Sequence, residues 1–452
     1  MKKEYSYIYF LGIGGIGMSA IARYYKFKGF EVSGYDRTPS DLTRRLENEG
    51  IPVHYEDNSE FIPKDVENTL VVYTPAIPDT LEEYRYVTSN GYRVIKRSRM
   101  LGEITSGQSC LAVAGTHGKT TTSTMIAHIL TDSGKGCSAF LGGISRNYGT
   151  NLLMGAGNTV VAEADEFDRS FLQLHPSIAI ITSMDADHLD IYGDLAHVQE
   201  AFRQFASQVS ETLILKYGLP VQYTDTGARI YTYHIDNPQA TFHAINLRTE
   251  KDGHFRFDLV HPGGVLEDIR VGTLGRVNVE NSIAAAAACL CYGVDAQKVR
   301  IAIGSFSGAK RRLEEHINTD SCVYIDDYAH HPAELAATIS SVREVFPDRK
   351  LTAVFQPHLY TRTRDLAPEF AKALSSVDKL ILLDIYPARE EPIEGVSSEI
   401  IFKDVTCPEK VLCRRADFLD MMKDEPVEVL VTFGAGDIDR FVEPLTEMLG
   451  NR

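Results

Sequence analysis

Three absences narrow what this 452-residue chain can be. It has no basic excess: 62 acidic side chains outnumber 46 basic ones, giving a net charge of −16, so we expect no nucleic-acid partner. It has no apolar run near the roughly 18 residues that span a bilayer, so we expect no membrane insertion. Its seven cysteines form no Cys-x-x-Cys pair, which is typical of reduced thiols. Any polyanionic ligand must therefore be held by local loops, metal ions and a few placed cations.

The beginning of the sequence has the charge pattern of a secretory signal, with two lysines before an apolar stretch. Glycines at positions 12, 14, 15 and 17 interrupt that stretch and disfavour a helical signal segment. The length exceeds what one hydrophobic core usually supports, so two or three domains are expected. We therefore expect a cytoplasmic protein of several domains.

The most informative segment is CLAVAGTHGKTTT at residues 110–122. An apolar run leads into a glycine turn and then into an amphipathic segment ending near Gly134, which predicts a strand, a loop and a helix. In such a P-loop the backbone N–H groups face a triphosphate, Lys119 reaches the β and γ oxygens, and the Thr120 hydroxyl ligates Mg²⁺. Val113 occupies the first glycine position of the general pattern, and a plain surface loop is the alternative. The flanking strand and helix favour a site for ATP or GTP. The residues assigned to it are Gly115, Thr116, His117, Gly118, Lys119, Thr120 and Thr121.

A second glycine loop follows the first predicted strand, residues 7–11. Gly12-Ile13-Gly14-Gly15-Ile16-Gly17 fits the pattern Gly-x-Gly-x-x-Gly, and the next strand, 31–34, leads to Asp36. This is the fingerprint of a dinucleotide-binding fold, in which the acidic residue takes a ribose hydroxyl. A further strand, 70–73, ends at Thr74. The loop suits NAD, and it suits other nucleotide diphosphates as well.

Two later strands also end in polar clusters. Residues 159–162 lead into Glu163-Ala164-Asp165-Glu166, and residues 177–182 lead into Asp185-Ala186-Asp187-His188-Leu189-Asp190. Ligands of open α/β sheets bind outside the carboxyl ends of the strands, so these clusters and the P-loop should surround one crevice. There they can complete a Mg²⁺ shell. Helix capping by surface Asp and Glu is the alternative.

From about residue 308 the pattern becomes a regular alternation of strands and helices, typical of a Rossmann-like domain. The cationic cluster Lys310-Arg311-Arg312 at its start is either a solvated loop or a phosphate clamp. Residues 275–281 are expected to precede an alanine-rich helix at 283–290. We predict an α/β fold of three domains: an N-terminal Rossmann-like domain (1–105), a central P-loop ATPase-like domain with a mostly parallel sheet (106–307), and a C-terminal Rossmann-like domain (308–452).

Taken together, these motifs resemble the Mur ligase family, the ATP-dependent enzymes that build the peptide stem of bacterial peptidoglycan. The resemblance covers essentially the whole chain. The motifs that carry it are GIGGIGMS at 12–19, AGTHGKTTT at 114–122, EADE at 163–166, DADHLD at 185–190, NVEN at 278–281, KRR at 310–312, DDYAHHP at 326–332 and GAGDI at 434–438. Within the family, QPHLYTRTRDL at 356–366 and DIYPAREEPIEGVSS at 384–398 look most like the members that add L-alanine.

The resemblance implies a reaction and a set of residue roles. L-Alanine would be joined to the lactyl carboxylate of UDP-N-acetylmuramate through an acyl phosphate, with ATP and Mg²⁺ as cofactors. The sugar nucleotide would be held by Gly12, Gly14, Gly15, Ile16, Gly17, Asp36 and Thr74. In addition to the P-loop, Asn281 would meet adenine, Arg312 the phosphates and Asp327 the ribose. Lys119, Glu163 and His188 would be catalytic, with Thr120, Glu163 and His188 at the metal. His330, His358 and Arg362 would bind the amino acid.

Some residues depart from the family pattern. Many alanine-adding members have histidine at position 277 and arginine at position 359, where this chain has Val277 and Leu359. Arg362 is therefore the expected partner of the amino-acid carboxylate. Residues 202–204, Phe-Arg-Gln, lack the lysine that members adding later residues carry there.

Three other functions remain open. A recycling ligase that attaches a tripeptide to the same sugar nucleotide shares the motifs. An NAD-dependent dehydrogenase explains the first glycine loop alone, and an ATP-binding switch without catalysis explains the P-loop alone.

Overall fold

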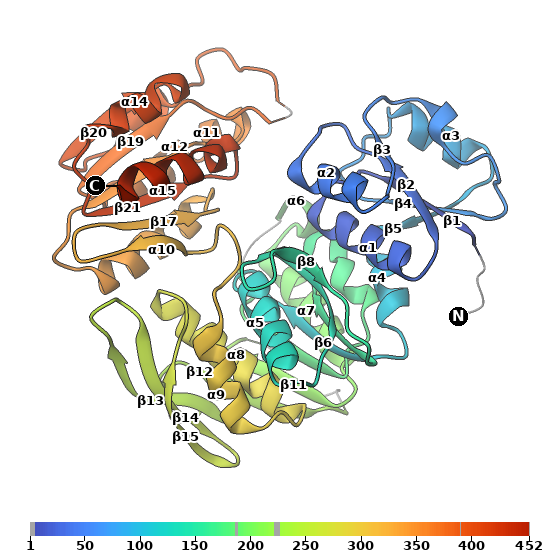
Figure 1. The fold of residues 1–452 in the computed structure, drawn as a ribbon, viewed down its shortest axis with the longest axis horizontal. Coiled ribbons are helices and arrows are strands. Elements are labelled where there is room, and N and C mark those ends of the chain that lie inside the picture. The colour runs from blue at the N-terminus through green and yellow to red at the C-terminus, as the bar shows by residue number, and fades with distance from the viewer. Residues whose placement is uncertain (1–4, 186–188, 221–226, 389, 452) are drawn as a thin grey trace. The chain divides into compact units, whose positions relative to one another are not determined.

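The structure, a computed structural model, describes residues 5–185, 189–220, 227–388 and 390–451. Its strands form three sheets of five, ten and six strands (Figure 1). The chain divides into two compact units, one of residues 1–245, 258–269 and 280–306 and the other of residues 246–257, 270–279 and 307–452. The α/β class with three domains is confirmed, whereas the boundaries at residues 105 and 307 stay predictions. Among the described helices, none is both long and apolar enough to cross a membrane.

The five-stranded sheet is parallel throughout, in the order β3-β2-β1-β4-β5. Its strands are β1 (Tyr7–Leu11), β2 (Glu31–Tyr35), β3 (Val53–His54), β4 (Thr69–Tyr73) and β5 (Arg93–Lys96), and its helices are α1 (Ile16–Phe27), α2 (Asp41–Asn48), α3 (Glu82–Ser89) and α4 (Arg97–Thr105). A 3₁₀ turn, η1, covers Ser59–Phe61. The strand order reverses between β1 and β4, which is where ligands bind in such sheets.

The ten-stranded sheet has the order β15-β14-β13-β12-β11-β10-β6-β9-β7-β8. Its strands are β6 (Ser109–Ala114), β7 (Ser138–Ser145), β8 (Thr150–Leu153), β9 (Thr159–Glu163), β10 (Ile178–Ile181), β11 (Thr212–Lys216), β12 (Arg229–His234), β13 (Phe242–Thr249), β14 (Phe255–His261) and β15 (Gly264–Arg270). The helices are α5 (Lys119–Asp132), α6 (Leu189–Tyr192), α7 (Leu195–Ser207), α8 (Arg276–Cys291) and α9 (Ala296–Ser305), with a 3₁₀ segment η2 (Phe167–Gln173).

Strands β9, β6 and β10 lie side by side and run parallel. The P-loop follows β6, Glu163 is the last residue of β9, and Thr182 comes directly after β10. Because neighbouring parallel strands end at the same edge of a sheet, the polar clusters after them begin at one edge. One hydrophobic cluster, which includes Phe10 of β1 and Ala112 of β6, runs through both the five-stranded and the ten-stranded sheets.

Helix α8 begins earlier than the sequence indicated. Residues 275–281 were expected to precede the helix, but α8 starts at Arg276 and includes both Asn278 and Asn281. Gly275 has a φ of +91°, and the Asn278 side chain donates to the Leu274 carbonyl at 2.7 Å. The expectation was wrong because asparagine and valine have low helix propensity, which the packing of the following alanines overrides. Ala284 to Ala288 are fully buried.

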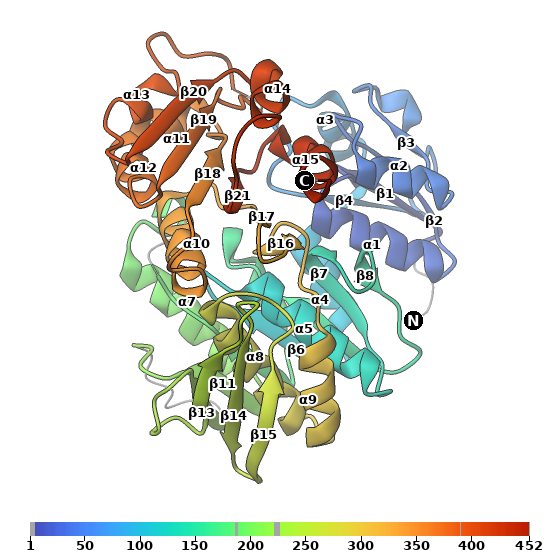
Figure 2. The same cartoon turned by 60° about the vertical axis from the view of Figure 1, so that its left-hand side comes forward.

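The six-stranded sheet has the order β16-β17-β21-β18-β19-β20, with only β16 antiparallel among the pairs described. Its strands are β16 (Glu314–Asn318), β17 (Val323–Asp327), β18 (Leu351–Phe355), β19 (Lys379–Leu383), β20 (Glu409–Cys413) and β21 (Val429–Phe433). The helices are α10 (Pro332–Val345), α11 (Tyr360–Asp365), α12 (Ala367–Leu374), α13 (Glu399–Phe402), α14 (Phe418–Met422) and α15 (Val442–Gly450), with 3₁₀ turns η3 (Arg415–Asp417) and η4 (Asp437–Phe441). Hydrophobic clusters pack on both faces of this sheet. Figure 2 shows helix α12 on one side of the sheet and helix α15 on the other.

Candidate functional site

The P-loop is shaped by two glycines that no other residue could replace without strain. Gly115 has a φ of +132°, and a Cβ there would collide with the Thr182 hydroxyl. Gly118 has a φ of +80° and forms the N-cap of α5, so that Lys119 is the first residue of the helix. The loop therefore turns tightly against the end of β10 and presents its backbone at a helix N-terminus, which is the geometry that binds phosphates.

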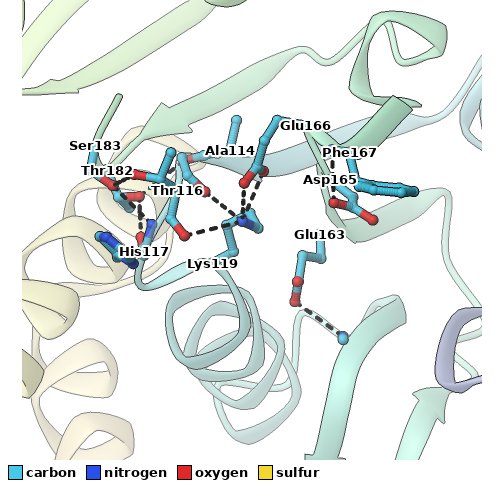
Figure 3. Close-up of polar contacts among 12 residues, drawn as sticks. Ala114, Thr116, His117, Lys119, Glu163, Asp165, Glu166, Phe167, Thr182 and Ser183 are labelled. Carbon is cyan, nitrogen blue, oxygen red and sulfur yellow. Dashed lines mark hydrogen bonds and ion pairs between the residues drawn. The ribbon is translucent and has the colours of Figure 1, made fainter. Parts of the chain in front are cut away.

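The ammonium group of Lys119 lies among protein acceptors (Figure 3). Its Nζ donates to the carbonyl oxygens of Gly115 at 2.6 Å and Thr116 at 3.4 Å, and to Glu166 Oε1 at 2.9 Å. Glu166 Oε2 lies 2.8 Å from the same nitrogen, and the two side chains are only 13% and 2% exposed. Burial alone would lower the pKa of Lys119, but the carboxylates of Glu166, Glu163 and Asp165 raise it above its ordinary value. Lys119 is therefore held in its charged form beside Glu166, whose own pKa is raised by burial against the lowering effect of Lys119.

Glu163 is held apart from that ion pair. Its Oε2 accepts a hydrogen bond from the Gly142 backbone nitrogen at 3.1 Å, the bond drawn to β7 in Figure 3. A Cβ at position 142 would collide with the Glu163 carboxylate, so the close approach requires glycine. Thr120 is buried in the first turn of α5, after the neighbouring strand β6. Carboxylate and hydroxyl oxygens suit Mg²⁺, so Thr120 and Glu163 fit the ion chemically.

The cluster after β10 packs against the P-loop. Thr116 Oγ1 lies 2.8 Å from Ser183 Oγ and donates to Asp185 Oδ2 at 3.2 Å. The Ser183 hydroxyl accepts from the His117 backbone nitrogen at 2.9 Å, and His117 Nε2 lies 3.5 Å from Asp185. His188, assigned to the metal from the sequence, lies outside the described residues. Within the part that is described, no group of three or more His, Cys, Asp or Glu side chains could hold a metal ion.

Asn281 reaches the same loop from helix α8. Its Oδ1 accepts a hydrogen bond from Thr122 Oγ1 at 3.3 Å, and a Cβ on Gly118 would lie 2.8 Å from that oxygen. The structure thus brings the sequence-assigned Asn281 to the beginning of α5, although the two residues are far apart in the chain.

A pocket of about 320 Å³ extends from the N-terminal glycine loop to the end of β9. The residues lining it include Gly15, Ile16, Gly17, Thr74 and Arg97 from the N-terminal part of the chain, and Gly142, Glu163 and Asp165 from the ten-stranded sheet and the loop after β9. Gly12, Gly14 and Asp36 do not line the pocket. Asp36 Oδ2 instead accepts the Gly14 backbone N–H at 2.8 Å, so this carboxylate fixes the shape of the loop behind the pocket.

Three residues assigned to amino-acid binding lie in the six-stranded domain. The rings of His330 and His358 are 6.0 Å apart, and His358 stacks on Tyr386 at 5.8 Å. Burial lowers the pKa of His330, with Arg362 and Arg312 contributing. Nη1 of Arg362 is buried and has no hydrogen-bond partner among the described residues. His330 therefore lies next to His358 and within the electrostatic influence of Arg362.

The two arginines of the 310–312 cluster differ in their contacts. Arg311 has a φ of +61° and pairs with Asp326 at 2.9 Å while donating to the Gly434 carbonyl at 2.6 Å. Both guanidinium groups lie 5.4 Å from the centre of the Tyr328 ring, but Arg312 has no ion pair among the described residues. Arg311 therefore supports the fold, and the assignment of Arg312 to the ATP phosphates stays a prediction.

Asp327, assigned to ribose, is engaged by the backbone. Its two carboxylate oxygens accept N–H groups of Leu313 at 2.7 Å and Ala329 at 2.8 Å. Burial raises the pKa of Asp327 to about 6, against the lowering effect of Arg312. Each carboxylate oxygen has a second lone pair, so a sugar hydroxyl can still donate to it.

Sequence reasoning missed two charged residues at these sites. Glu166 was included in a polar cluster without a role, yet it holds Lys119. Arg97 was not singled out at all, and it lines the pocket and lies 3.2 Å from Asp165. The adjacent cations Lys96 and Arg97 were one sequence signal, and the strand that ends at Lys96, β5, was not predicted.

Comparison with known proteins gives full-length matches. Three domains match in order: residues 7–109 match the Mur ligase family catalytic domain, residues 113–289 the Mur ligase middle domain, and residues 311–436 the Mur ligase glutamate ligase domain. The chain is 50% identical to UDP-N-acetylmuramate–L-alanine ligase of Parabacteroides distasonis, covering 98% of this chain and 97% of that protein. It is 49% identical to the enzyme of the same name from Porphyromonas gingivalis, covering 98% of each.

Solved structures give the same picture. The crystal structure of a UDP-N-acetylmuramate–alanine ligase from Thermotoga maritima is similar with a TM-score of 0.82 at 26% identity, covering 97% of this chain and 99% of that one. A murein peptide ligase from Psychrobacter arcticus shares the fold with a TM-score of 0.71 at 21% identity, covering 99% of both chains.

Proposed function

We propose that this chain, which belongs to the Mur ligase family, joins L-alanine to the lactyl carboxylate of UDP-N-acetylmuramate at the expense of ATP. The observation that carries the proposal is the continuity of the pocket, which runs from a glycine loop suited to a nucleotide diphosphate to Glu163, beside the P-loop strand. The product is a precursor of peptidoglycan. Because the reaction consumes ATP, we place it in the cytoplasm.

The chemistry follows from the charges of the reactants. The lactyl carboxylate attacks the γ-phosphorus of ATP, the bond to the β–γ bridging oxygen breaks, and ADP leaves with that electron pair. Both reactants are anionic, so catalysis depends on positioning and on neutralising charge more than on a general base. Lys119 supplies one positive charge at the start of α5 when phosphate oxygens replace Glu166 as its partner.

Mg²⁺, when bound, would neutralise negative charge on the phosphates. We assign Thr120 and Glu163 as its protein ligands because they offer oxygen atoms after adjacent strands β6 and β9. His188 is assigned on the family resemblance. Glu163 is preorganised by the Gly142 N–H, which holds its carboxylate in place.

The second step needs a neutral amine. The nitrogen of L-alanine attacks the acyl carbon, phosphate leaves with the C–O bonding electrons, and the amine gives up a proton. Nδ1 of His330 lies 3.0 Å from the Tyr328 carbonyl oxygen, which can only accept, so Nδ1 carries a hydrogen. Because the pKa of His330 is lowered, its Nε2 carries a lone pair near neutral pH. We assign His330 and His358 to the amino group and Arg362, with its unpaired buried Nη1, to the carboxylate.

Phosphate release is the direct test. Purified protein is incubated with ATP, Mg²⁺, UDP-N-acetylmuramate and, in separate reactions, L-alanine, glycine, L-serine or the tripeptide used in recycling. We expect fastest turnover with L-alanine, and none when Lys119→Ala replaces the wild type. Preference for the tripeptide would identify the recycling reaction instead. Micromolar binding of NADH without binding of the sugar nucleotide would refute the ligase assignment.

A further inference from the structure

Two adjacent basic residues connect the N-terminal domain to the loop after β9. Lys96, at the end of β5, lies 2.7 Å from Asp168, and Arg97, the first residue of α4, lies 3.2 Å from Asp165. The pairs differ in their surroundings. Arg97 lines the pocket and is 21% exposed, whereas Lys96 does not line it and is 44% exposed. Of these two neighbouring cations, Arg97 therefore lies in the pocket and Lys96 lies outside it.

Arg97 lies directly against the glycine loop. A Cβ built on Gly17 would be 2.8 Å from Arg97 Nη1, so the guanidinium occupies the space beside the first turn of α1. The backbone of this turn is where the diphosphate of a sugar nucleotide is expected under the proposed function. A planar guanidinium at this point can donate two parallel hydrogen bonds to phosphate oxygens.

The charge of the pocket lining requires a cation. Of the lining residues, all of them in the described part of the chain, three are charged: Glu163, Asp165 and Arg97. Two carboxylates facing an anionic ligand would repel it, and Arg97 is the single positive charge on the lining. Its ion pair with Asp165 uses Nη2, while Nη1 is the atom next to Gly17. The same side chain therefore has donors directed at both the acidic loop and the glycine loop.

We propose that Arg97 is a substrate-binding residue that holds the diphosphate of the UDP-sugar. This inference rests on the proposed function, because it concerns the same sugar nucleotide. The diphosphate is favoured over the lactyl carboxylate because Arg97 contacts the Gly17 end of the pocket, whereas the carboxylate must reach the end near Glu163 and the P-loop.

Binding of two ligands by titration calorimetry tests the proposal. UDP-N-acetylmuramate carries the diphosphate and the lactyl carboxylate, and UDP-N-acetylglucosamine carries only the diphosphate. We expect Arg97→Ala to raise the Kd for both ligands by a similar factor, about ten- to a hundredfold for one lost charge-assisted contact. Arg97→Lys keeps the positive charge but lacks the planar guanidinium, so it should lower the affinity by an intermediate factor. This variant also tests the proposal if Arg97→Ala does not fold.

Three controls separate a ligand contact from a structural bridge. Lys96→Ala removes the neighbouring ion pair and should leave both Kd values within about twofold, since a surface pair contributes little. Asp165→Asn should leave the affinity unchanged or tighter, because a carboxylate is removed from the pocket. ATP binding should be unchanged in all variants.

Other outcomes would overturn the proposal. Weakening by Asp165→Asn as large as that by Arg97→Ala would show that Arg97 acts only by bridging the two domains. If Arg97→Ala lowered the affinity for UDP-N-acetylmuramate alone, Arg97 would bind the lactyl carboxylate and not the diphosphate. Failure of the wild-type protein to bind either sugar nucleotide would refute the proposed function itself, which is a distinct result from failure of the variant alone.

Discussion

The pair formed by Lys119 and Glu166 predicts that a carboxylate competes with ATP for the P-loop lysine. In the structure, Lys119 Nζ donates to Glu166 and to the Gly115 carbonyl. ATP phosphates must take at least one of these positions. An interaction that must be broken when ATP binds reduces the affinity for ATP by the free energy of that interaction. Replacing Glu166 by glutamine, which has the same shape, should therefore tighten binding of ATP.

The magnitude follows from the change in the hydrogen bond. Lys119 stays charged, so Glu166→Gln keeps a hydrogen bond to a charged group, which contributes about 1.5–3 kcal/mol, and removes only the opposite charge of the partner. We expect this to weaken the competing contact by about half of that amount, roughly 1–1.5 kcal/mol. This corresponds to about a tenfold lower Kd for ATP. The same change leaves the buried Lys119 charge less well compensated, so the nucleotide-free protein should lose a similar amount of stability.

Two measurements check this prediction. Calorimetric titration with ATP in the presence of EDTA isolates the lysine–phosphate contact from any effect on metal. Amide hydrogen exchange over α5, without nucleotide, reports the stability of the P-loop helix. Asp168→Asn is the matched control. It removes one carboxylate from the same loop, but Asp168 pairs with Lys96 and not with Lys119. Weaker ATP binding by Glu166→Gln, with unchanged protection of α5, would refute the reasoning and show that Glu166 positions Lys119 for the phosphate.

Three further predictions concern the other sites. Arg362→Ala should raise the KM for L-alanine about ten- to a hundredfold with ATP binding intact, measured by phosphate release, and an unchanged KM would assign the carboxylate to another group. Glu163→Ala should lower kcat at least about 100-fold, as for the loss of one preorganised electrostatic partner. Gly142→Ala should do the same by displacing the Glu163 carboxylate, and near-normal kcat in either variant would refute the metal assignment. Because the pKa of Asp327 is raised to about 6, the folded chain binds its proton more tightly than the unfolded chain does. Its contribution to the free energy of unfolding should therefore fall as pH rises from about 4 to about 6 and stay level above, checked by urea denaturation of the wild type against Asp327→Asn. A contribution that rises over this interval would contradict the shift.

Much of the fold could be predicted because apolar runs end in glycine or polar motifs. The strand expected at residues 7–11 is β1, and the strand before the P-loop is β6. Parallel strands are buried on both faces, so their sequences are almost continuously apolar and easy to recognise. The glycines that follow them are needed for positive φ or close approach, which makes the loops recognisable as well.

The partner of Lys119 could not be predicted, and the local backbone explains why. The acidic cluster offers Glu163, Asp165 and Glu166 as equivalent candidates. After it, Asp168 and Arg169 both adopt positive φ, 54° and 55°, which turns the chain sharply. Such conformations are uncommon for residues other than glycine, so no sequence signal indicated this turn.

A positive φ angle also explains why the two arginines after Lys310 make different contacts. Both arginines lie over Tyr328, but Arg311, which has a φ of +61°, also pairs with the buried Asp326, and Arg312 has no ion pair among the described residues. In the sequence, both arginines belong to one cationic cluster and could not be told apart. The backbone conformation distinguishes the arginine that pairs within the fold from the one that we predict to bind a ligand.

Leu359, at the N-cap of α11, has a φ of +73° and a ψ of +136°, a conformation that glycine adopts readily and leucine does not. Strain of this kind costs on the order of 1–3 kcal/mol and persists only where surrounding contacts enforce it. The Leu359 N–H donates to the Tyr386 carbonyl at 3.0 Å, which ties the strained residue to the ring stacked on His358. A laboratory selection for heat resistance should therefore favour glycine at position 359, and the variants it yields would hold the loop that carries His358 less rigidly.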